Sequence, residues 1–512
     1  MAHQSTIALM HRQSIFLSSF QTDEKILFIL NPFSRISHPN VKRPGGNTAP
    51  VNFIVVSYEL GIPMYIRVIF MSALLLGCTS NAMVQRVDYI VDNVQVITMN
   101  SPDVKPDSAI VIDNGKITKI IKSSDAKKIY ATHRIDGKGR YLMPGLADMH
   151  VHLRWDPQRM FNLFLAHGVT TVANMRFEDG KFDHLVLRDK VRNGEISGPR
   201  YLITGSHLEE GFPASIDEVE RVLDDHQRKR IDFVKIHGDL SPDIYKAIIT
   251  GAKRRDLKVI GHAQHKMPLK DSLVLNSLEH MEELLYVTRD EARVSDFSTD
   301  FLSAYRANAH RLWDKSYREK VVEDVASSGI YLDPTLIVYK MVGIWQSDAH
   351  LIALRDAPAL RYLPADVARF WLSPATNPYQ ADDFPITKPE VDKNFQLMLL
   401  LTKELHDKGV PLLSGTDSFG TLVPGISLHD ELTLLVEAGL SPFEALRCST
   451  VNVAAYLGET GKAGVIQPGA RADFILLDKN PLLDINNSRT ASGVFTQGRW
   501  LPKDLLAKLI SQ

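Results

Sequence analysis

Eight short apolar runs, separated by segments with helical signals, constrain the fold of this chain more than any other feature of its sequence. Several of the runs are almost continuously apolar, as strands buried on both faces of a parallel sheet must be. Serine precedes proline at Ser241 and Ser441, which is typical of a helix start. Eight strand and helix units predict an α/β protein with a (β/α)8 TIM barrel over residues 144–462. The runs are Ala147–His152, Val169–Asn174, Arg200–Gly205, Phe233–His237, Lys258–His262, Ser277–His280, Ile330–Leu336 and Pro411–Ser414.

Segments near both ends of the chain show a different pattern, in which short alternating β runs are separated by turn residues. One of these turns is Asp113-Asn114-Gly115, and Asn-Gly is a strong signal for a tight hairpin. Residues 472–478 and 493–500 repeat the pattern near the C-terminus. We therefore expect residues 86–143 and 463–501 to pair into one small β-sandwich domain.

Two stretches, about 281–329 and 340–405, are far longer than a crossover helix needs. They are rich in charged residues and contain Trp313, Trp345 and Trp371. Long insertions after barrel strands usually cover the mouth of the site, so we expect helical lid elements. An interface between copies of the chain, giving a homo-oligomer, is the alternative use of these insertions.

The charge balance of the chain argues against a polyanionic partner. The 512 residues carry a formal net charge of −1 and contain no long basic or acidic block. A nucleic-acid surface needs clustered cations, so no nucleic-acid partner is expected. We expect a small molecule or a short peptide as the partner instead.

A segment at residues 64–78 has the features of a secretion signal. One cation precedes about ten apolar residues, too few to span a bilayer but suited to a signal peptide. Its end, Leu75-Leu76-Gly77-Cys78, resembles a bacterial lipobox. The resemblance implies that Cys78 is lipidated and that this lipid anchor is the sole membrane contact. It also implies a location in the bacterial cell envelope, in the periplasm or at the outer membrane. A buried apolar segment with a chance cysteine is the alternative.

The sequence around this segment leaves two further questions open. Residues 1–63 show no sustained period and are read as a non-native leader before a start at Met64, or as a disordered tail. Cys78 and Cys448 are the two cysteines, which excludes a disulfide framework but leaves one bridge between them open.

The candidate chemistry begins with His150 and His152, one residue apart at the end of the first run. Positions i and i+2 of a strand share a face, so both imidazoles are expected to point toward one site. A pair of this kind is half of a metal site. Taken alone, it is more often a solvated pair or a buried pair with protein partners.

Four more polar residues lie within or just after later runs: Lys235, His262, His280 and Asp417. Each has an ordinary explanation, such as a core histidine, a helix cap at Asp417 or a lysine that reaches solvent. All six residues nevertheless fall on the carboxyl side of the predicted strands, where active sites of TIM barrels lie. Because all six residues are predicted at the same end of the strands, we expect them to form one site.

At this point the chain resembles the amidohydrolase superfamily of metal-dependent hydrolases over about residues 86–500. The matching motifs are Met-Pro-Gly-Leu-Ala-Asp-Met-His-Val-His, Phe-Val-Lys-Ile, Gly-His-Ala, Leu-Glu-His, Gly-Thr-Asp and the closing segment Gly464–Pro481. His280 follows His262 by 18 positions, a spacing similar to the branch of imidazolonepropionase and the Xaa-Pro dipeptidases.

The resemblance implies a site with two divalent metal ions, zinc first among them because the ligands are imidazole and carboxylate. It implies that His150, His152 and Asp417 hold one ion and that His262 and His280 hold the second. Lys235 would bridge them after N6-carboxylation, because an ammonium group has no lone pair. Asp417 would also be catalytic, moving a proton from a metal-bridging hydroxide to the leaving nitrogen.

The function implied is hydrolysis of an amide C–N bond in a dipeptide, an N-acyl amino acid or a cyclic amide. A deaminase or a lactonase on the same metal site, and a surface lipoprotein that only binds, are the alternatives. His207, His237, Tyr339 and His429 are further polar residues near strand ends, and each is equally consistent with substrate contact and with ordinary packing.

Overall fold

The computed structural model describes residues 21–22, 25–26, 86–175 and 182–511. The chain divides into two compact units, Met1–Asn81 and Ala82–Gln512. In the first unit, strands β1 (Gln21–Thr22) and β2 (Lys25–Ile26) pair antiparallel. The expected signal segment and Cys78 lie outside the described residues, so secretion and lipidation stay predictions. Every feature below belongs to the second unit.

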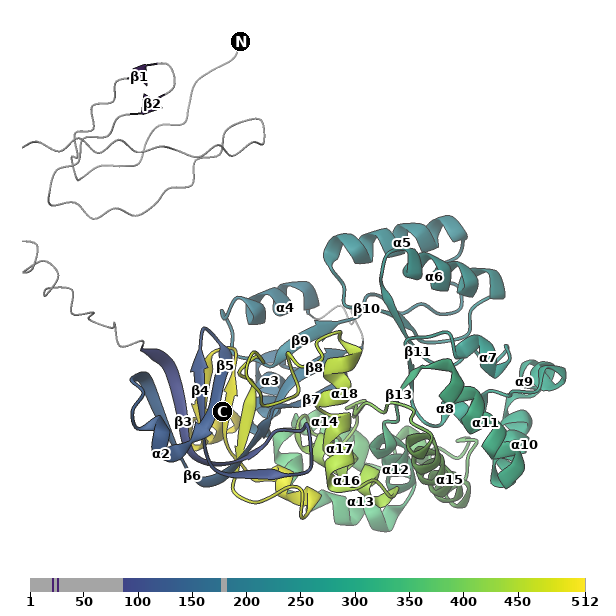
Figure 1. Cartoon of the computed structure of the whole chain (residues 1–512). Coiled ribbons are helices and arrows are strands. Elements are labelled where there is room, and N and C mark those ends of the chain that lie inside the picture. The colour runs from purple at the N-terminus through teal and green to yellow at the C-terminus, as the bar shows by residue number, and fades with distance from the viewer. Residues whose placement is uncertain (1–20, 23–24, 27–85, 176–181, 512) are drawn as a thin grey trace, which may run out of the picture. The chain divides into compact units, whose positions relative to one another are not determined.

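The centre of this unit consists of two parallel sheets (Figure 1). One has the order β7-β8-β9 and the other the order β10-β11-β12-β13. Their strands are buried along almost their whole length, which explains the continuous apolar runs in the sequence. The strands are β7 (Leu146–Val151), β8 (Val169–Asn174), β9 (Arg200–Ile203), β10 (Phe233–Ile236), β11 (Lys258–Gly261), β12 (Ser277–Glu279) and β13 (Tyr331–Asp333).

Isolated backbone contacts connect the two sheets. After β9, Leu208 N–H donates to the Lys235 carbonyl of β10 at 2.9 Å. On the other side, Leu413 N–H donates to the Leu332 carbonyl of β13 at 2.9 Å, and Met149 N–H of β7 donates to the Ser414 carbonyl at 2.8 Å. The described residues thus form two parallel sheets with single bridges between them, without one continuous eight-stranded ladder.

Of the eight predicted strands, one is shorter than predicted and one is an isolated bridge. The strand predicted over 330–336 stops at Asp333, because Pro334 lacks an N–H and Thr335 has a left-handed backbone with φ 43°. The run 411–414 forms a single bridge, Leu332 to Leu412, rather than a strand. It begins with Pro411, which cannot donate to a neighbouring strand.

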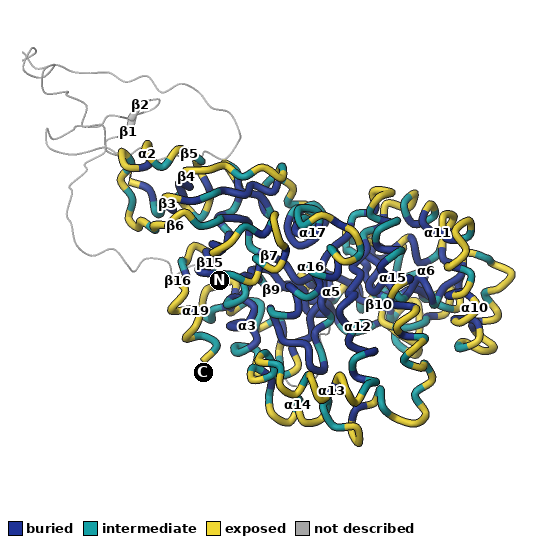
Figure 2. The backbone as a smooth tube through the Cα atoms, turned by 90° about the horizontal axis from the view of Figure 1, so that it is seen from below, coloured by how far each residue is buried: buried dark blue, intermediate teal, exposed yellow. Residues whose placement is uncertain are grey.

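Helices follow most of the central strands and cover the sheets. Figure 2 shows the tube at the centre of the unit as buried and the outer turns of the helices as exposed. The helices between or after the central strands are α3 (Pro157–Ala166), α4 (His184–Arg192), α5 (Ile216–Lys229), α6 (Pro242–Arg254), α7 (Leu269–Ser272), α16 (Ile426–Glu437), α17 (Pro442–Cys448), α18 (Val451–Tyr456) and α19 (Lys503–Ile510).

The two long insertions are helical. The first contains α8 (Glu283–Tyr286), η1 (Glu291–Arg293), α9 (Val294–Thr299), α10 (Phe301–Trp313) and α11 (Lys315–Ser328). The second contains α12 (Leu336–Trp345), α13 (Asp348–Arg355), η2 (Pro358–Tyr362), α14 (Ala365–Leu372), η3 (Pro378–Gln380) and α15 (Lys388–Asp407). Helix α12 packs along α15 within this insertion and also contacts α16, which follows it in the chain. The boundaries proposed for the domains stay predictions.

The two terminal segments pair into one mixed sheet of seven strands, in the order β16-β15-β14-β6-β3-β4-β5. The turn at Asn114 and Gly115 has positive φ at both residues, 50° and 70°, as the Asn-Gly hairpin requires. The pairing of the two ends is seen, whereas a two-layered sandwich is not confirmed. The strands are β3 (Val87–Ile97), β4 (Val104–Asp113), β5 (Lys116–Lys122), β6 (Ala131–Pro144), β14 (Phe474–Leu477), β15 (Ala491–Thr496) and β16 (Arg499–Pro502), with α2 (Ser123–Ala126) and η4 (Ile485–Arg489) beside them.

Among the described residues, no helix has both the length and the apolar character that a membrane span requires. Cys448, at the end of α17, is a buried free thiol. Burial raises the pKa of this thiol above its usual value.

A close approach between two backbones fixes the position of the candidate histidine on β11. Gly261 precedes His262, has φ +145°, and would place a Cβ atom 1.9 Å from the Ile236 carbonyl oxygen of β10. No other residue can occupy this position without separating the two strands.

We expect Gly261→Ala to lower the free energy of unfolding by about 4 kcal/mol or more, because a backbone clash and a disallowed φ act together. Gly115→Ala is the matched control: it also has positive φ but nothing within 4 Å of the added Cβ, so about 1 kcal/mol is expected. Urea unfolding followed by circular dichroism measures both. Equal losses in the two variants would contradict the role given to Gly261.

Candidate metal centre

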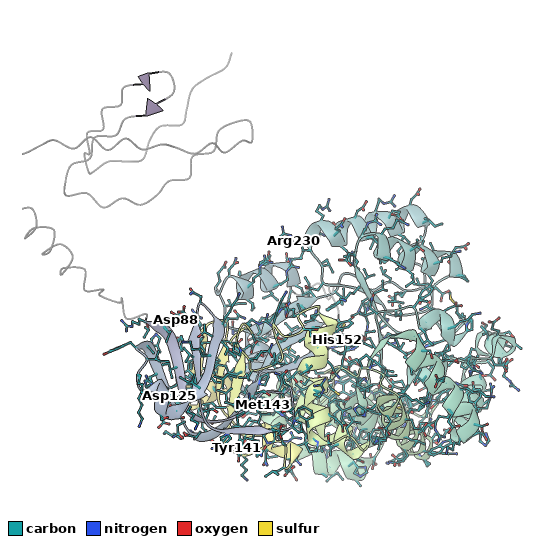
Figure 3. All side chains as sticks on the ribbon, viewed as in Figure 1. Asp88, Asp125, Tyr141, Met143, His152 and Arg230 are labelled. Atoms are coloured by element: carbon teal, nitrogen blue, oxygen red, sulfur yellow. The ribbon has the colours of Figure 1, made fainter. Side chains whose placement is uncertain are left out.

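The six residues predicted from the sequence line one cavity of about 290 Å³. They come from the carboxyl ends of β7, β10, β11 and β12 and from the loop after residues 411–414. Figure 3 shows the labelled His152 inside the ribbon of the unit, among side chains from several elements. The lining residues are His150, His152, Arg154, His207, Lys235, His237, His262, His280, Trp371, Asp417 and Phe419.

His150, His152 and Asp417 form one of three groups of potential metal ligands found among the described residues. His152 Nε2 lies 2.8 Å from Asp417 Oδ1, and His150 Nε2 lies 3.6 Å from the same oxygen. One ligand atom from each residue lies within 4.8 Å of the others. Burial of Asp417 opposes its ionisation, but His150 and His152 outweigh this effect and hold the pKa of Asp417 well below its usual value.

His262 and His280 complete the ring of imidazoles around this group. The ring centroids of His150 and His280 are 4.7 Å apart, and those of His262 and His280 are 4.8 Å apart. Burial lowers the pKa of both His150 and His280 well below the usual value, so both rings are neutral. A neutral imidazole keeps one lone pair, which is what a metal ligand must offer.

Partners on Nδ1 orient three of the rings. His150 donates to Glu279 Oε2 at 2.7 Å, His262 donates to Glu283 Oε1 at 2.8 Å, and His280 is hydrogen-bonded to Thr335 Oγ1 at 2.7 Å. Because Nδ1 donates to a carboxylate in His150 and His262, the lone pair of these two rings lies on Nε2. Acidic partners of this kind are typical of metal-binding histidines.

Glu283 is the partner that sequence reasoning missed. One carboxylate accepts from His262 Nδ1 at 2.8 Å, from His265 Nε2 at 2.7 Å and from Ala263 N–H at 3.1 Å. Burial would raise the pKa of Glu283, but His262 and His265 outweigh it and lower the pKa below its usual value. Its position just after the Leu-Glu-His motif, at the start of α8, was the only signal in the sequence.

Lys235 lies in the middle of the site and is 1% exposed. Its Nζ makes no hydrogen bond to any described residue. Burial lowers the pKa of the amine, and nearby carboxylates, Glu279 first among them, act in the opposite direction. An orphaned buried amine is costly, so this side chain needs a further group to be satisfied.

Two of the site residues have strained backbones. His280 has φ 69° and Asp417 has φ 43°, both in the left-handed region that residues with a Cβ rarely adopt. Each is held by a short backbone hydrogen bond: His280 N–H donates to the Asp333 carbonyl at 2.7 Å, and Asp417 N–H donates to the His150 carbonyl at 2.7 Å. Strain of this kind clusters at functional sites.

Four buried carboxyl groups lie beneath the imidazoles. Burial raises the pKa of Asp148 to about 7 and that of Glu431 to about 8, and it also raises the pKa of Glu279 and Asp333. Asp148 accepts from Thr416 Oγ1 at 2.7 Å, which fixes the loop that carries Asp417. Sequence reasoning did not find these residues, because a buried acid leaves no spacing pattern.

Of the four polar residues left unassigned from the sequence, two line the cavity and two do not. His207 and His237 line the cavity, with stacked rings 4.4 Å apart. Tyr339 is hydrogen-bonded to Tyr305 and lies outside the lining set. His429 bonds Ser488 Oγ at 2.8 Å and the His167 carbonyl at 2.9 Å, so both of its nitrogens serve packing.

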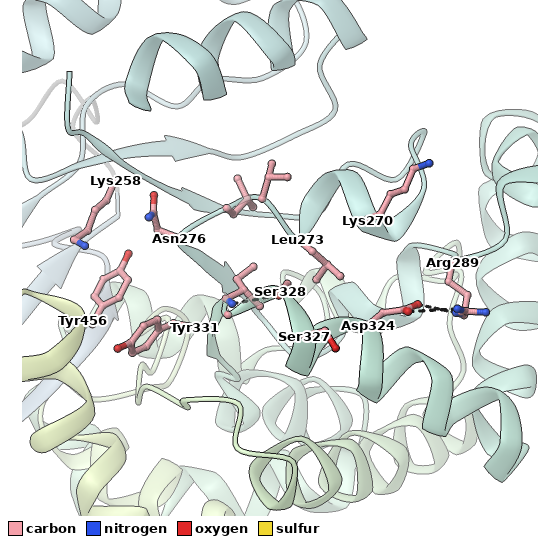
Figure 4. Close-up of a pocket in the computed structure, with 14 residues that line it drawn as sticks. Lys258, Lys270, Leu273, Asn276, Arg289, Asp324, Ser327, Ser328, Tyr331 and Tyr456 are labelled. Atoms are coloured by element: carbon pink, nitrogen blue, oxygen red, sulfur yellow. Dashed lines mark hydrogen bonds and ion pairs between the residues drawn. The ribbon is translucent and has the colours of Figure 1, made fainter. Parts of the chain in front are cut away.

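A larger pocket of about 810 Å³ lies at the opposite ends of β11, β12 and β13 (Figure 4). Lys258, Asn276 and Tyr331, labelled there, stand at or just before the first residues of these strands. This pocket contains no histidine, and its Arg289 is paired with Asp324 at 2.7 Å. It therefore lacks the ligands of the first cavity.

The residues at the candidate site fit a divalent metal centre. They provide four imidazoles and one carboxylate around a cavity, with His152 Nδ1 and Lys235 Nζ buried and without hydrogen-bond partners among the described residues. Imidazole and carboxylate ligands suit zinc and its neighbours.

Comparisons with known proteins agree with this chemistry. The model of the amidohydrolase family matches residues 141–276 and 399–501. Adenine deaminase of Lysinibacillus sphaericus (strain C3-41) is 22% identical over 409 residues, which cover 76% of this chain and 54% of that protein. L-hydantoinase of Paenarthrobacter aurescens is 24% identical over 174 residues, 32% of this chain and 35% of that protein. The chain thus spans about half the length of the adenine deaminase that it matches.

Solved structures show the fold of the second unit. A Xaa-Pro dipeptidase with bound methionine aligns with a TM-score of 0.56 and 20% identity, covering 81% of this chain and 99% of that one. A bottromycin amidohydrolase aligns with a TM-score of 0.61 and 20% identity, covering 82% of this chain and 88% of that one. At this identity, the likeness concerns the α/β fold.

We expect Glu283→Gln to weaken metal binding at the candidate site about 10- to 100-fold, because one of three donors loses its acceptor. Metal content after dialysis against a chelator, measured by mass spectrometry, should fall below that of the original protein. Glu291→Gln, an exposed carboxylate paired with Lys270, is the control. Unchanged metal content in Glu283→Gln would contradict the role of this carboxylate.

Proposed function

Because this chain belongs to the amidohydrolase family, we propose that it is a hydrolase that uses two divalent metal ions, zinc by preference, to cleave an amide C–N bond. The substrate is a dipeptide, an N-acyl amino acid or a cyclic amide. The single observation that carries the proposal is that six residues far apart in sequence line one cavity, with the buried Lys235 amine among them.

The two metal positions follow from the grouping of the side chains. His150, His152 and Asp417 would hold one ion, since their ligand atoms already lie within 4.8 Å of one another. His262 and His280 would hold the second. Lys235, carboxylated at N6, would bridge the two and would gain the partners that its amine lacks. When bound, such ions make water more acidic and polarise a carbonyl group.

Asp417 is the residue that moves the proton. Its carboxylate lines the cavity and lies 2.8 Å from His152 Nε2, and its backbone N–H donates to the His150 carbonyl. In hydrolysis, the oxygen of water forms a bond to the amide carbon while the C–N bond breaks. Asp417 takes the proton that the water loses and gives it to the departing nitrogen, so the carboxylate is regenerated.

We also propose that the two central sheets and residues 411–414 together form a closed (β/α)8 barrel. The bridges at Leu208 and Leu412 support this, because they connect the edges of both sheets. The terminal strands would form the small β domain of the family.

The setting of the enzyme is a further part of the proposal. The lipobox-like end of residues 64–78 supports lipidation of Cys78 and a place in the bacterial cell envelope. A small-molecule or short-peptide substrate fits this setting and the size of the cavity, and a homo-oligomer would use the two insertions.

Deamination of an adenine-like ring is the second candidate, since five of the relatives found are named adenine deaminase. Lys235 favours amide hydrolysis, because a bridging carboxylated lysine belongs with two ions. A metal content of two ions per chain, together with no release of ammonia from adenine, would favour amide hydrolysis over deamination.

We expect Asp417→Asn to lower kcat at least about 100-fold, because an amide cannot take up the proton. The variant should retain the ion held by His262 and His280, so the loss of activity should exceed the loss of metal. Turnover of a dipeptide panel and metal content are measured on the same sample. Full turnover at full occupancy would contradict the proton role.

Carboxylation of Lys235 predicts that metal uptake depends on carbon dioxide. Metal-free protein in carbonate-depleted buffer should gain its second ion slowly, and added bicarbonate should speed the uptake. Lys235→Met should bind one ion at a rate independent of bicarbonate. If bicarbonate has no effect on the original protein, the bridging role is wrong.

A further inference from the structure

The cavity at the candidate metal centre has one aromatic wall. Trp371 and Phe419 are its apolar lining residues, with ring centroids 5.6 Å apart. Both rings are half-buried, whereas the rest of the lining consists of histidines and charged residues. Apolar surface left uncovered inside a polar cavity marks the place where an apolar part of a ligand is bound.

The wall is held by a cluster of aromatic rings behind it. Trp345 is fully buried and lies 4.7 Å from Trp371 and 5.4 Å from Phe419, measured between centroids. Its indole N–H donates to Thr421 Oγ1 at 2.9 Å. Tyr379 of η3 stacks on Trp345 at 5.4 Å. The rings that face the cavity are therefore fixed before a ligand arrives, which lowers the entropy cost of binding.

One buried amide holds the cluster together, and one glycine lets the loop that follows Asp417 pass against it. Asn377, 2% exposed, donates from its amide to the carbonyls of Trp345 and Trp371 at 3.0 and 3.2 Å. Gly420 would place a Cβ atom 2.6 Å from Trp345, so the loop can pass under the rings only with glycine here. The second insertion and the Asp417 loop thus form one unit.

The wall stands beside the reacting groups. Phe419 follows Asp417 by two positions, and the guanidinium of Arg154, two positions after His152, lies 5.8 Å from the Phe419 centroid. The stacked pair His207 and His237 also lines the cavity. A substrate whose carbonyl reaches Asp417 can therefore place a neighbouring substituent against Phe419 and Trp371.

We propose that the substrate of this enzyme is an amide with an aromatic ring next to the scissile bond, and that Trp371 and Phe419 bind this ring. The inference rests on the amide-cleaving function proposed above. Aromatic pairs prefer offset or edge-to-face contacts, and a half-buried indole beside a phenyl ring offers both. Trp371 and Phe419 are specificity-determining residues on this view, and they take no part in proton transfer.

Two matched pairs of amides test the proposal on the metal-loaded full chain. N-benzoylglycine and N-acetylglycine differ by a ring on the acyl side, and N-acetylphenylalanine and N-acetylalanine differ by a ring on the amine side. We expect kcat/KM to be at least about tenfold higher for the ring-bearing member of one pair, given the strength of aromatic contacts. Equal kcat/KM within both pairs would overturn the proposal.

Variants assign the preference to the wall. Trp371→Ala should lower kcat/KM for the ring-bearing amide about tenfold more than for its ring-free partner, and Trp371→Phe should retain the preference. Trp313→Ala is the control, since Trp313 is 37% exposed on α10 and lies outside the cavity lining. If Trp371→Ala lowers both members of a pair equally, the ring is not bound by this wall.

A binding measurement separates failure of this inference from failure of the proposed function. Benzoate and acetate share the carboxylate that a metal ion would bind, so their difference in Kd, measured by calorimetry, reports on the ring alone. Benzoate should bind at least about tenfold tighter, and Trp371→Ala should remove the difference. If no amide is cleaved but this difference in Kd is seen, the proposed amide hydrolysis is wrong and the proposed binding of the ring by Trp371 and Phe419 is supported. Equal Kd values for benzoate and acetate would show that Trp371 and Phe419 do not bind the ring.

Discussion

The structure depends on how the second unit compensates a set of buried ionisable groups around one cavity. Four imidazoles, an amine and an aspartate have left water together, and desolvation of this kind costs several kcal/mol per uncompensated charge. The protein meets part of the cost with fixed carboxylate partners, Glu279 for His150 and Glu283 for His262. The Lys235 amine has no such partner among the described residues. A stable fold with this arrangement is understandable if further groups, metal ions and a carboxylated lysine, complete it.

The backbone at the site is also strained. His280 and Asp417 adopt left-handed conformations because single hydrogen bonds from neighbouring strands override their local preference. Two prolines near these residues limit the neighbouring strands. Pro334 and Pro411 have no backbone N–H to donate, so β13 is short and residues 411–414 form a single bridge. The deviations from regular sheet structure therefore lie at the site, where local rules are most often broken.

Much of the arrangement could be predicted from the sequence, and the remainder could not for definite reasons. The strand periodicity placed His150, Lys235 and His262 on the correct edge, because a buried parallel strand has an unmistakable apolar run. Glu283 and Asp333 were missed, since a partner that touches a ligand from another element has no fixed spacing. The terminal strands were found, but their order in one seven-stranded sheet depends on long-range pairing that local patterns do not contain.

The second insertion shows how such long-range pairing adds specificity to a shared chemical centre. Imidazoles and Asp417 can serve any carbonyl substrate, so they do not distinguish one amide from another. Discrimination must come from groups that touch the part of the substrate that does not react. On the proposals made above, those groups are Trp371, on a helix more than 40 positions before Asp417, and Phe419, just after it. Trp345 packs against both rings, and Phe419 follows Asp417 by two positions, so one cluster of side chains would position both the specificity residues and the proposed proton-transfer residue.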